Sequence, residues 1–338
     1  MNAHSKKSPS SGCENSLISK QQEEKINEVR RLLGRLPNRL STFGSDASIS
    51  RYLRARNWNV KKATKMLKAT LKWRLEYKPE EIKWADVAHE AETGKIYRSN
   101  HTDKLGRTIL IMRPRCQNSK SVKSQIKYLV YCMENAILNL PENQEEMVWL
   151  IDFDGFNLSN ISVKSTRETA RVLQEYYPER LGVAILYNPP KFFEPFWKVV
   201  KPFLEPKTAN KVKFVYADDP NTHKIMEDLF DVDQLESAFG GKDTEGFDVN
   251  KYAERMREDD KKMLSFWANG ANASESINQL SFETESSLNP ATYESDSDAT
   301  DEKADESSSP EADAEAEAVS PNYLPVTNSS SNTTVDVK

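Results

Sequence analysis

Short apolar runs that alternate with amphipathic stretches are the feature that most constrains this 338-residue chain. Between residues 107 and 230 the pattern predicts strands separated by helices. The predicted strands are Arg107–Met112, Met147–Phe153, Leu181–Tyr187 and Lys211–Tyr216, and the predicted helices are Ser121–Leu140, Ser165–Tyr176, Phe192–Leu204 and His223–Phe230. Strands that are linked by helices pair in parallel through right-handed crossovers. The sequence therefore predicts an α/β fold around a sheet with a parallel core.

The region before this alternation is predicted to be helical. Asp46 or Ser45 can cap one helix, and Asn59 can cap a second with apolar residues at helical spacing. The opposite face of the second helix carries the lysines Lys61, Lys62, Lys65, Lys68 and Lys72. Such a face is usually only solvated, and attraction to an anionic membrane is the less favoured interpretation. A closing helix is predicted over Phe247–Phe266.

Charge is divided unevenly along the chain. Residues 271–338 carry 15 Asp and Glu against two Lys, a net charge of −13, whereas the whole chain carries −5, so residues 1–270 carry about +8. The acidic segment has few large apolar side chains and cannot bury enough surface to offset the entropy of ordering. We expect disordered tails at residues 1–21 and 269–338. No nucleic-acid partner is expected, because the lysine face lacks aromatic side chains and an acidic tail would compete with phosphate.

The sequence offers no catalytic constellation. It lacks a Gly-rich phosphate loop, a GxGxxG after a strand and a GxSxG elbow, and its three cysteines and four histidines show no metal-ligand spacing. Asp152 and Asp154 could form a carboxylate pair, but a turn at a strand end is the favoured interpretation. No apolar run approaches the roughly 20 residues of a membrane span. We therefore predict a protein that is not an enzyme, binds no metal or cofactor, and stays in a reducing, cytoplasmic compartment.

The segment Pro189–Leu204 is unusual among the predicted helices. Its apolar side chains cover much of the circumference, and Pro195 and Pro202 interrupt it. These side chains are Phe192, Phe193, Phe196, Trp197, Val199, Val200, Phe203 and Leu204. A helix that is apolar nearly all round is normally buried between layers, so periodicity favours burial over a movable lid.

Five longer strings carry a family resemblance. In chain order they are Tyr52–Leu67, Asp103–Ile111, Val148–Phe156, Tyr176–Val215 and Leu235–Gly241. Together they resemble the CRAL-TRIO family, in particular its Sec-fourteen-like phosphatidylinositol transfer branch. The resemblance covers about residues 22–268 and leaves both tails untouched.

The resemblance implies a CRAL-TRIO fold with a small N-terminal helical lobe over residues 22–78 and a lipid-binding lobe over residues 79–245. The second lobe is expected to have a mixed, mainly parallel sheet, and a C-terminal helix is expected over residues 246–268. The resemblance also implies an apolar cavity that encloses one phospholipid, with Phe192–Leu204 as a gate helix over its mouth. Burying two acyl chains of about 16 to 18 carbons corresponds to roughly 25 kcal/mol, so a carrier must enclose both chains.

The resemblance further implies which residues bind the lipid headgroup. The family recognises phosphoinositol through positions that match Glu179, Lys211, Thr208 and Arg56, and Arg180 fits the same role less specifically. A buried phosphodiester must be paired by cations and hydroxyls. Structural alternatives remain open, because Arg56 could pair with a helix carboxylate and Lys211 could be an exposed strand residue.

Two positions depart from the family pattern. Asn57 stands where a lysine is common, which removes one cation near the headgroup. Members that also carry phosphatidylcholine have small hydroxyl residues where this chain has Met147 and Trp149. These two residues share a strand face because they are two positions apart. If that face lines the cavity, the protein is expected to bind phosphatidylinositol and to bind phosphatidylcholine poorly.

The resemblance thus implies a non-enzymatic carrier that transfers phosphatidylinositol between membranes or presents it to another protein. A monomer is expected, with transient contact to a membrane surface and a phosphoinositide kinase as a candidate partner. The alternative is a carrier of a sterol, tocopherol or retinoid, which would leave Glu179 and Lys211 unpaired. An α/β hydrolase or phosphatase is the remote alternative.

Overall fold

A five-stranded sheet forms the centre of the protein in the computed structural model, which describes residues 19–157, 159 and 162–275. The strands lie in chain order: β1 (Ile96–Thr102), β2 (Thr108–Met112), β3 (Met147–Asp152), β4 (Leu181–Tyr187) and β5 (Val212–Val215). β1 is antiparallel to β2, and β2 to β5 are parallel. The expected α/β fold with a mixed, mainly parallel sheet is confirmed.

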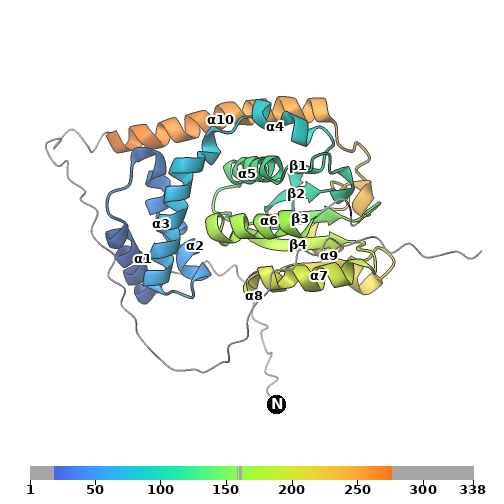
Figure 1. The fold of residues 1–338 in the computed structure, drawn as a ribbon, viewed down its shortest axis with the longest axis horizontal. Coiled ribbons are helices and arrows are strands. Elements are labelled where there is room, and N and C mark those ends of the chain that lie inside the picture. Colours follow the sequence, from blue (N-terminus) through green and yellow to red (C-terminus); the bar gives the residue numbers. More distant parts are fainter. Residues whose placement is uncertain (1–18, 158, 160–161, 276–338) are drawn as a thin grey trace, which may run out of the picture. The chain divides into compact units, whose positions relative to one another are not determined.

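The helices that connect the parallel strands follow from this strand order. They are α5 (Val122–Leu138), α6 (Val163–Tyr176), and α7 (Phe193–Val200) with α8 (Pro206–Asn210). Each right-handed crossover moves the chain one strand further in the same direction, so the connecting helices lie on one face of the sheet. Figure 1 shows α5, α6 and α7 on that face. The opening between this helix layer and the sheet is where a ligand cavity can form.

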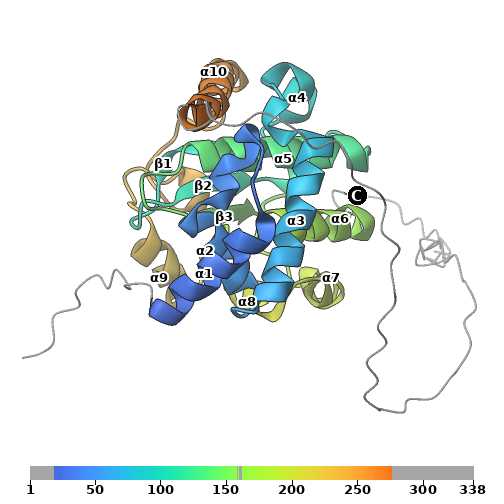
Figure 2. The ribbon, with the colours of Figure 1, turned by 90° about the vertical axis from the view of Figure 1, so that its left-hand side faces the viewer.

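The N-terminal helices have an apolar core of their own. α1 (Lys20–Leu33), α2 (Asp46–Ala55) and α3 (Val60–Tyr77) lie together in Figure 2 with the 3-10 turn η1 (Asn38–Gly44). Ser45 and Asn59 cap α2 and α3 as predicted, each accepting a hydrogen bond from a backbone N–H in the first turn. This core is made of Ile26, Val29, Leu40, Ile49, Tyr52, Leu53, Ala63, Met66, Leu67 and Leu71.

The first lobe is joined to the second by buried polar and aromatic contacts. Arg74 of α3 forms a two-point ion pair with Glu134 of α5, and both side chains are buried. Trp73 stacks on Tyr176 of α6 with ring centroids 4.2 Å apart. These contacts join α3 to α5 and α6, and they hold the first lobe against the second.

Several element bounds differ from the prediction. α4 (Trp84–Ala91) and β1 were not predicted, and β1 has the polar sequence IYRSNHT of an edge strand. α9 (Pro220–Leu229) starts before the predicted His223, because Asp219 caps it and Pro220 occupies its first position. α10 (Val249–Glu275) continues beyond the predicted end at Phe266 and packs against η1, α4 and α5.

The ends of the chain were predicted to be disordered. Ser19 caps α1 through a capping box, so the first helix begins at Lys20, inside the predicted N-terminal tail. At the other end α10 runs to Glu275, inside the predicted acidic tail. The remaining tail residues, 1–18 and 276–338, lie outside the described part of the chain.

Candidate functional site

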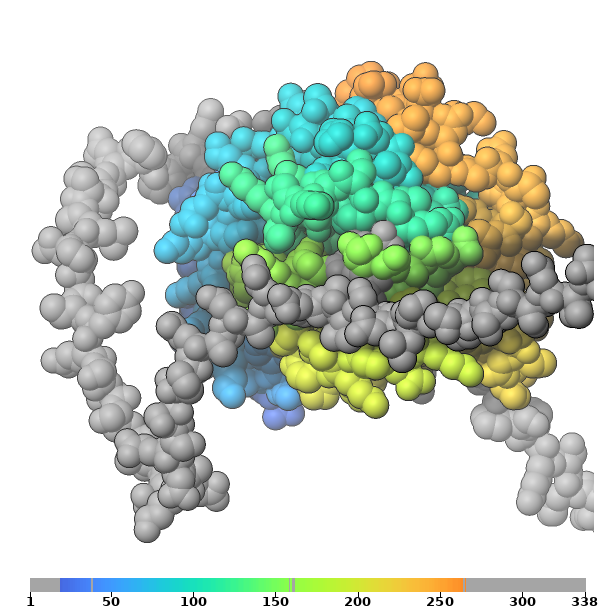
Figure 3. All heavy atoms as spheres, turned by 45° about the vertical axis from the view of Figure 1, so that its right-hand side comes forward, coloured from blue at the N-terminus to red at the C-terminus, as the bar shows by residue number. Residues whose placement is uncertain are grey.

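A cavity of about 760 Å³ lies between the sheet and the helices α5, α6 and α7. Its middle is apolar, and its two ends are polar. The apolar walls include Ile96, Met112, Leu129, Met133, Trp149, Ile151, Phe153, Ala170, Leu173, Ala184, Leu186, Phe193, Phe196, Trp197, Val200, Leu204 and Val212. Figure 3 shows the face on which α6 and α7, two of these walls, lie next to each other. Such a chamber suits a large hydrophobic ligand with a polar group at one end.

One polar end of the cavity contains Lys211 and Glu179. Lys211 Nζ donates to the backbone oxygen of Leu181 at 2.5 Å. It lies 3.4 Å from a carboxylate oxygen of Glu146 and 3.9 Å from one of Glu179. The ammonium group therefore lies between two carboxylates at the beginning of β4, and neither carboxylate approaches it closely.

Glu179 has an unusual backbone conformation. Its φ is 56°, in the left-handed region that L-residues other than Asn and Asp rarely adopt. Glu179 follows Pro178 directly before β4, and both residues line the cavity. Non-glycine residues with this backbone conformation are most frequent at binding and active sites, where the surrounding structure holds them in it.

Arg180 lines the same end of the cavity and is half-buried. Its Nη1 donates to the backbone oxygen of Glu145 at 3.0 Å, and no carboxylate oxygen lies within 4 Å of it in the described part of the chain. The Glu145 carboxylate is occupied by Arg51 and Arg54, each at 2.6 Å. Burial, followed by the proximity of Arg51, lowers the pKa of Arg180 to about 10. Among the described residues, this guanidinium group therefore has no carboxylate partner.

Thr208 and Arg56 complete the predicted headgroup set. Thr208 lines the cavity in α8, and its backbone oxygen accepts from the N–H of Lys211. Arg56 does not line the cavity but forms an ion pair at 2.9 Å with Glu205, which does. The structure thus brings Glu179, Arg180, Lys211 and Thr208 to one end of the cavity and places Arg56 beside it.

The predicted helix over Phe192–Leu204 is shorter than expected. α7 ends at Val200, and a 3-10 turn, η5 (Lys201–Phe203), follows because Pro202 removes a backbone donor. The side chains divide between two faces. Phe193, Phe196, Trp197, Val200 and Leu204 line the cavity, whereas Phe192 and Val199 are each 49% exposed. Phe203 is half-buried, with the Arg167 guanidinium 4.8 Å above its ring. The sequence predicted a helix that is buried nearly all round. In the structure, α7 has one face that lines the cavity and one face that is exposed.

The two positions that were predicted to decide whether phosphatidylcholine binds differ in their surroundings. Trp149 lines the cavity together with Ile151 and Phe153. Met147 is fully buried in the main core and is not among the lining residues. β3 pairs in regular register with β2 from Met147 to Ile151, so Met147 and Trp149 share one face of the sheet, as predicted. The cavity extends along this face to Trp149 and does not reach Met147 at the start of the strand. The expectation that both residues line the cavity is therefore correct for Trp149 and wrong for Met147.

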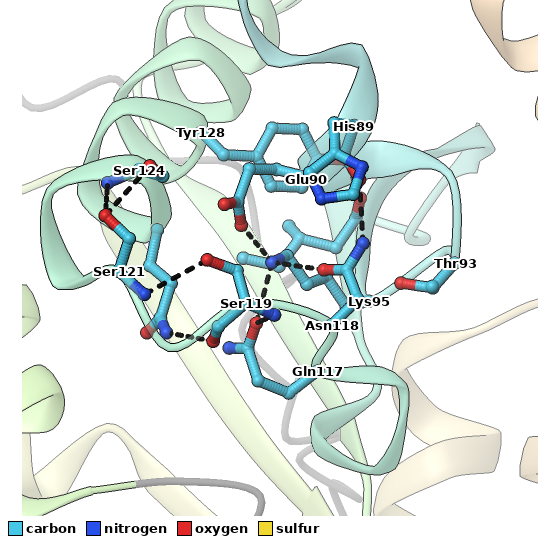
Figure 4. Close-up of polar contacts among 12 residues, drawn as sticks. His89, Glu90, Thr93, Lys95, Gln117, Asn118, Ser119, Ser121, Ser124 and Tyr128 are labelled. Carbon is cyan, nitrogen blue, oxygen red and sulfur yellow. Dashed lines mark hydrogen bonds and ion pairs between the residues drawn. The ribbon is translucent and has the colours of Figure 1, made fainter.

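The opposite end of the cavity is also polar, and it contains the buried Lys95, whose charge is paired, and the exposed Lys120. Figure 4 shows the buried Lys95, whose Nζ pairs with Glu90 and donates to Gln117 Oε1 at 2.7 Å and Asn118 Oδ1 at 2.8 Å. Burial lowers the pKa of Lys95, and Glu90 opposes this shift. Amides and hydroxyls line this end: Gln117, Asn118, Ser119, Gln125, Ser159, Ser162, Ser165, Thr166 and Thr169.

Sequence reasoning missed several polar residues in and beside the cavity. Glu146 and Glu205 approach the predicted headgroup cations from the loop before β3 and from the segment before α8. Lys95 directly precedes β1, which was not predicted. Only Glu205 lies inside one of the family strings, whereas Glu146 and Lys95 lie outside them, and a charged residue between predicted elements resembles any solvated loop residue.

Two further kinds of feature were searched for in the described residues. No group of three or more His, Cys, Asp and Glu side chains is placed to hold a metal ion within residues 19–157, 159 and 162–275. Across the same part of the chain, no helix has the length and apolar composition needed to cross a membrane.

The protein consists of a helical lobe that packs on an α/β lobe, with a cavity under α6 and α7. This arrangement defines a class of two-lobed proteins whose cavity suits a large hydrophobic ligand. Family models match this division: the CRAL/TRIO N-terminal domain matches residues 25–69 and the CRAL/TRIO domain matches residues 91–241. The chain belongs to the CRAL-TRIO family.

Curated relatives include transfer proteins of fungi. The chain is 34% identical over 204 residues to phosphatidylinositol transfer protein PDR17 of Saccharomyces cerevisiae, covering 56% of either chain. It is 30% identical over 217 residues to phosphatidylinositol transfer protein CSR1 of Eremothecium gossypii, covering 60% of this chain and 48% of the relative. A CRAL-TRIO domain-containing protein of Schizosaccharomyces pombe is 37% identical over 194 residues, which span 57% of this chain and 18% of the relative. The chain thus spans about half or less of these relatives' lengths.

Among solved structures, the crystal structure of Sfh5 has a similar fold. The TM-score is 0.57 at 15% sequence identity, and the match covers 75% of this chain and 99% of that chain. At this level of identity the similarity concerns the fold alone.

Proposed function

We propose that this protein binds phosphatidylinositol in its cavity and transfers it between membranes, or presents it to another protein, without catalysing a reaction. The observation that carries the proposal is the half-buried Arg180, which lines the cavity without a carboxylate partner in the described residues. A lipid phosphate supplies the anion that this guanidinium group lacks. Similarity to proteins named as phosphatidylinositol transfer proteins supports the same ligand.

The other residues of this end fit the inositol ring. Inositol hydroxyls need acceptors as well as donors, and Glu179 is an acceptor whose contact with Lys211 is long, at 3.9 Å. Lys211 and Thr208 offer donors at the same end. A ligand with one phosphodiester and several hydroxyls therefore satisfies groups of both kinds, which an uncharged ligand would leave unsatisfied.

α7 is proposed to act as the gate of this cavity. Its inner face covers the cavity, and its outer face exposes Phe192 and Val199 beside the exposed Lys191, Lys198 and Lys201. Apolar side chains flanked by lysines suit the interface of an anionic membrane, where the apolar groups enter the boundary and the ammonium groups stay with the headgroups. The cavity-facing aromatic residues can then leave their positions without entering water.

A carrier of an uncharged hydrophobic ligand is the second candidate. The amide- and hydroxyl-lined end near Lys95 favours it, because Glu90 neutralises that lysine, Lys120 is exposed to solvent, and the amides and hydroxyls suit a neutral polar group. Arg180 and Glu179 would then have no ligand partner at the other end, so we favour the phospholipid.

Loading from mixed vesicles tests the proposal. The purified protein is incubated with vesicles that contain equal amounts of phosphatidylinositol, phosphatidylcholine and cholesterol, and the bound lipid is identified by mass spectrometry. Phosphatidylinositol is expected as the main ligand, and Arg180→Met should lower its share about tenfold. Recovery of mainly cholesterol, or an unchanged share in the variant, would contradict the proposal.

A further inference from the structure

The segment that follows α7 is held by one side-chain amide. Gln174, in the last turn of α6, donates from Nε2 to the backbone oxygen of Phe203 at 2.7 Å. Its Oε1 accepts from the backbone N–H of Glu205 at 2.5 Å. A single amide thus binds the chain on both sides of Leu204, as a neighbouring strand would.

The first lobe holds the same segment from the other side. Arg56 pairs with the Glu205 carboxylate at 2.9 Å. Lys207 Nζ donates to Asn57 Oδ1 at 2.6 Å and to the backbone oxygen of Arg54 at 3.1 Å. Residues 203–207 are therefore attached both to α6 and to the link between α2 and α3. We call Gln174 and Arg56, with their partners Phe203 and Glu205, the hinge latch.

The two ends of α7 are attached by different kinds of contact. At its start, Phe193 packs edge-on against Phe153 and Phe156, with ring centroids 4.6 Å and 5.7 Å apart. At its end, the polar hinge latch is added to the contact of Arg167 with the Phe203 ring and to the packing of Trp197 against Phe214. The apolar contacts at the start of α7 weaken when a membrane surface replaces the surrounding water. The polar contacts at the end of α7 break when a few backbone bonds rotate.

We propose that the hinge latch sets the rate at which α7 uncovers the cavity, so that Gln174 is a positioning residue for lipid exchange. The inference rests on the proposed function only in requiring that α7 moves. Displacing Phe203–Glu205 from α6 breaks both of the part-buried hydrogen bonds of the Gln174 amide. Removing the amide should therefore speed opening about five- to tenfold.

Arg56 gives the latch a connection to the ligand. It pairs with Glu205, which lines the cavity end that holds Arg180 and Lys211. Because Arg56 itself does not line the cavity, an anionic headgroup at this end acts on the pair through the Glu205 carboxylate, which it repels. A bound headgroup thus weakens one half of the latch, while Gln174 keeps the other half closed.

Hydrogen–deuterium exchange of the full chain tests the latch. In Gln174→Met, which keeps the length of the side chain but loses the amide, amides of residues 193–205 should exchange about fivefold faster. Gln174→Glu keeps the acceptor for Glu205 and should be intermediate. Gln125→Met is the matched control, because that amide lines the same cavity but bonds Ser119 and Ser165. Unchanged exchange over 193–205, or equal acceleration in β4, would overturn the proposal.

Charge reversal separates the latch from headgroup binding. Arg56→Glu alone should speed exchange over residues 193–205, and adding Glu205→Arg should restore slow exchange because the ion pair re-forms with opposite polarity. A double variant that exchanges as fast as the single one would overturn the role of the ion pair. Amide exchange needs no particular lipid, so this outcome is independent of which ligand the cavity holds.

Discussion

Arg74 and Glu134 form a buried two-point ion pair between the two lobes, with Nη1 to Oε1 at 2.8 Å and Nη2 to Oε2 at 3.0 Å. Glu134 also accepts from the hydroxyl of Tyr177 at 2.6 Å, and Arg74 also reaches Glu80 at 3.3 Å. Tyr177 lines the cavity, so the ion pair connects α3 with the cavity wall. The first lobe is thereby part of the frame that shapes the binding site.

Removing one partner of this pair should be costly. Arg74→Met leaves the Glu134 carboxylate buried without its cation, and we expect the free energy of unfolding to fall by about 3 kcal/mol. Lys72→Met on the same helix removes an exposed contact of 3.9 Å with Glu76. This variant should change the free energy of unfolding by less than about 0.5 kcal/mol. Urea denaturation measures both. Similar values for the two variants would show that the buried pair does not hold the lobes together.

The same pair makes stability depend on pH. Burial raises the pKa of Glu134, but Arg74 and Tyr177 outweigh this and hold it below the ordinary 4.5. The unfolded chain then binds a proton more readily than the folded one, so the stabilisation is present above pH 4.5 and is lost as pH falls through the folded pKa. Unfolding measured between pH 6 and pH 3 should show this loss in the wild type. Glu134→Gln should be less stable at pH 6 and show a shallower decline; an unchanged slope would contradict the assignment.

Trp149 is expected to exclude phosphatidylcholine. It lines the cavity, and its indole N–H is buried without an acceptor in the described residues. Trp149→Thr supplies space and a hydroxyl, and we expect the bound phosphatidylcholine share to rise about tenfold. Met147→Thr is the control: it should lower stability by about 2 kcal/mol and leave the lipid ratio unchanged. If the bound phosphatidylcholine share rises in both variants, or in neither, Trp149 is not the residue that excludes phosphatidylcholine.

The outer face of α7 should govern exchange at membranes. Phe192→Ser with Val199→Ser removes two side chains that are each 49% exposed, so stability should change little. Because these side chains lose their burial in the membrane interface, lipid exchange between vesicles should slow about tenfold while the amount of bound lipid stays the same. Leu105→Ser, a 65% exposed residue in the turn between β1 and β2, should have no effect.

Changing the inner face of α7 should give a different result. Phe196→Ser with Trp197→Ser alters the cavity wall itself and should reduce bound lipid as well as exchange. If the outer-face and inner-face variants lose bound lipid equally, α7 would be a structural wall rather than a gate.

Local signals in the sequence predict much of the fold. Ser45, Asn59 and Ser121 were expected at helix starts and do cap α2, α3 and α5, because capping depends only on nearby residues. The strand β1 escaped prediction since its alternation of Tyr97 with polar residues is weak, and its place is fixed by pairing with β2.

The site was predictable only in part. Strings of the family placed Glu179, Lys211 and Thr208 together, but periodicity could not reveal that Arg56 pairs with Glu205 across the lobes. Met147 and Trp149 share a strand face, but only Trp149 lines the cavity, because the cavity does not extend along β3 as far as Met147. Such relationships arise from tertiary contacts, which a local pattern does not encode.

Transfer of phosphatidylinositol between vesicles tests the central claim most directly. The wild type should transfer it, and Glu179→Gln with Lys211→Met should abolish transfer while the thermal unfolding temperature stays within a few degrees of the wild type. Lys213→Met, which changes an exposed lysine of β5 two residues after Lys211, should transfer normally. Undiminished transfer by a folded Glu179→Gln, Lys211→Met double variant would contradict the proposal that this end of the cavity binds the headgroup.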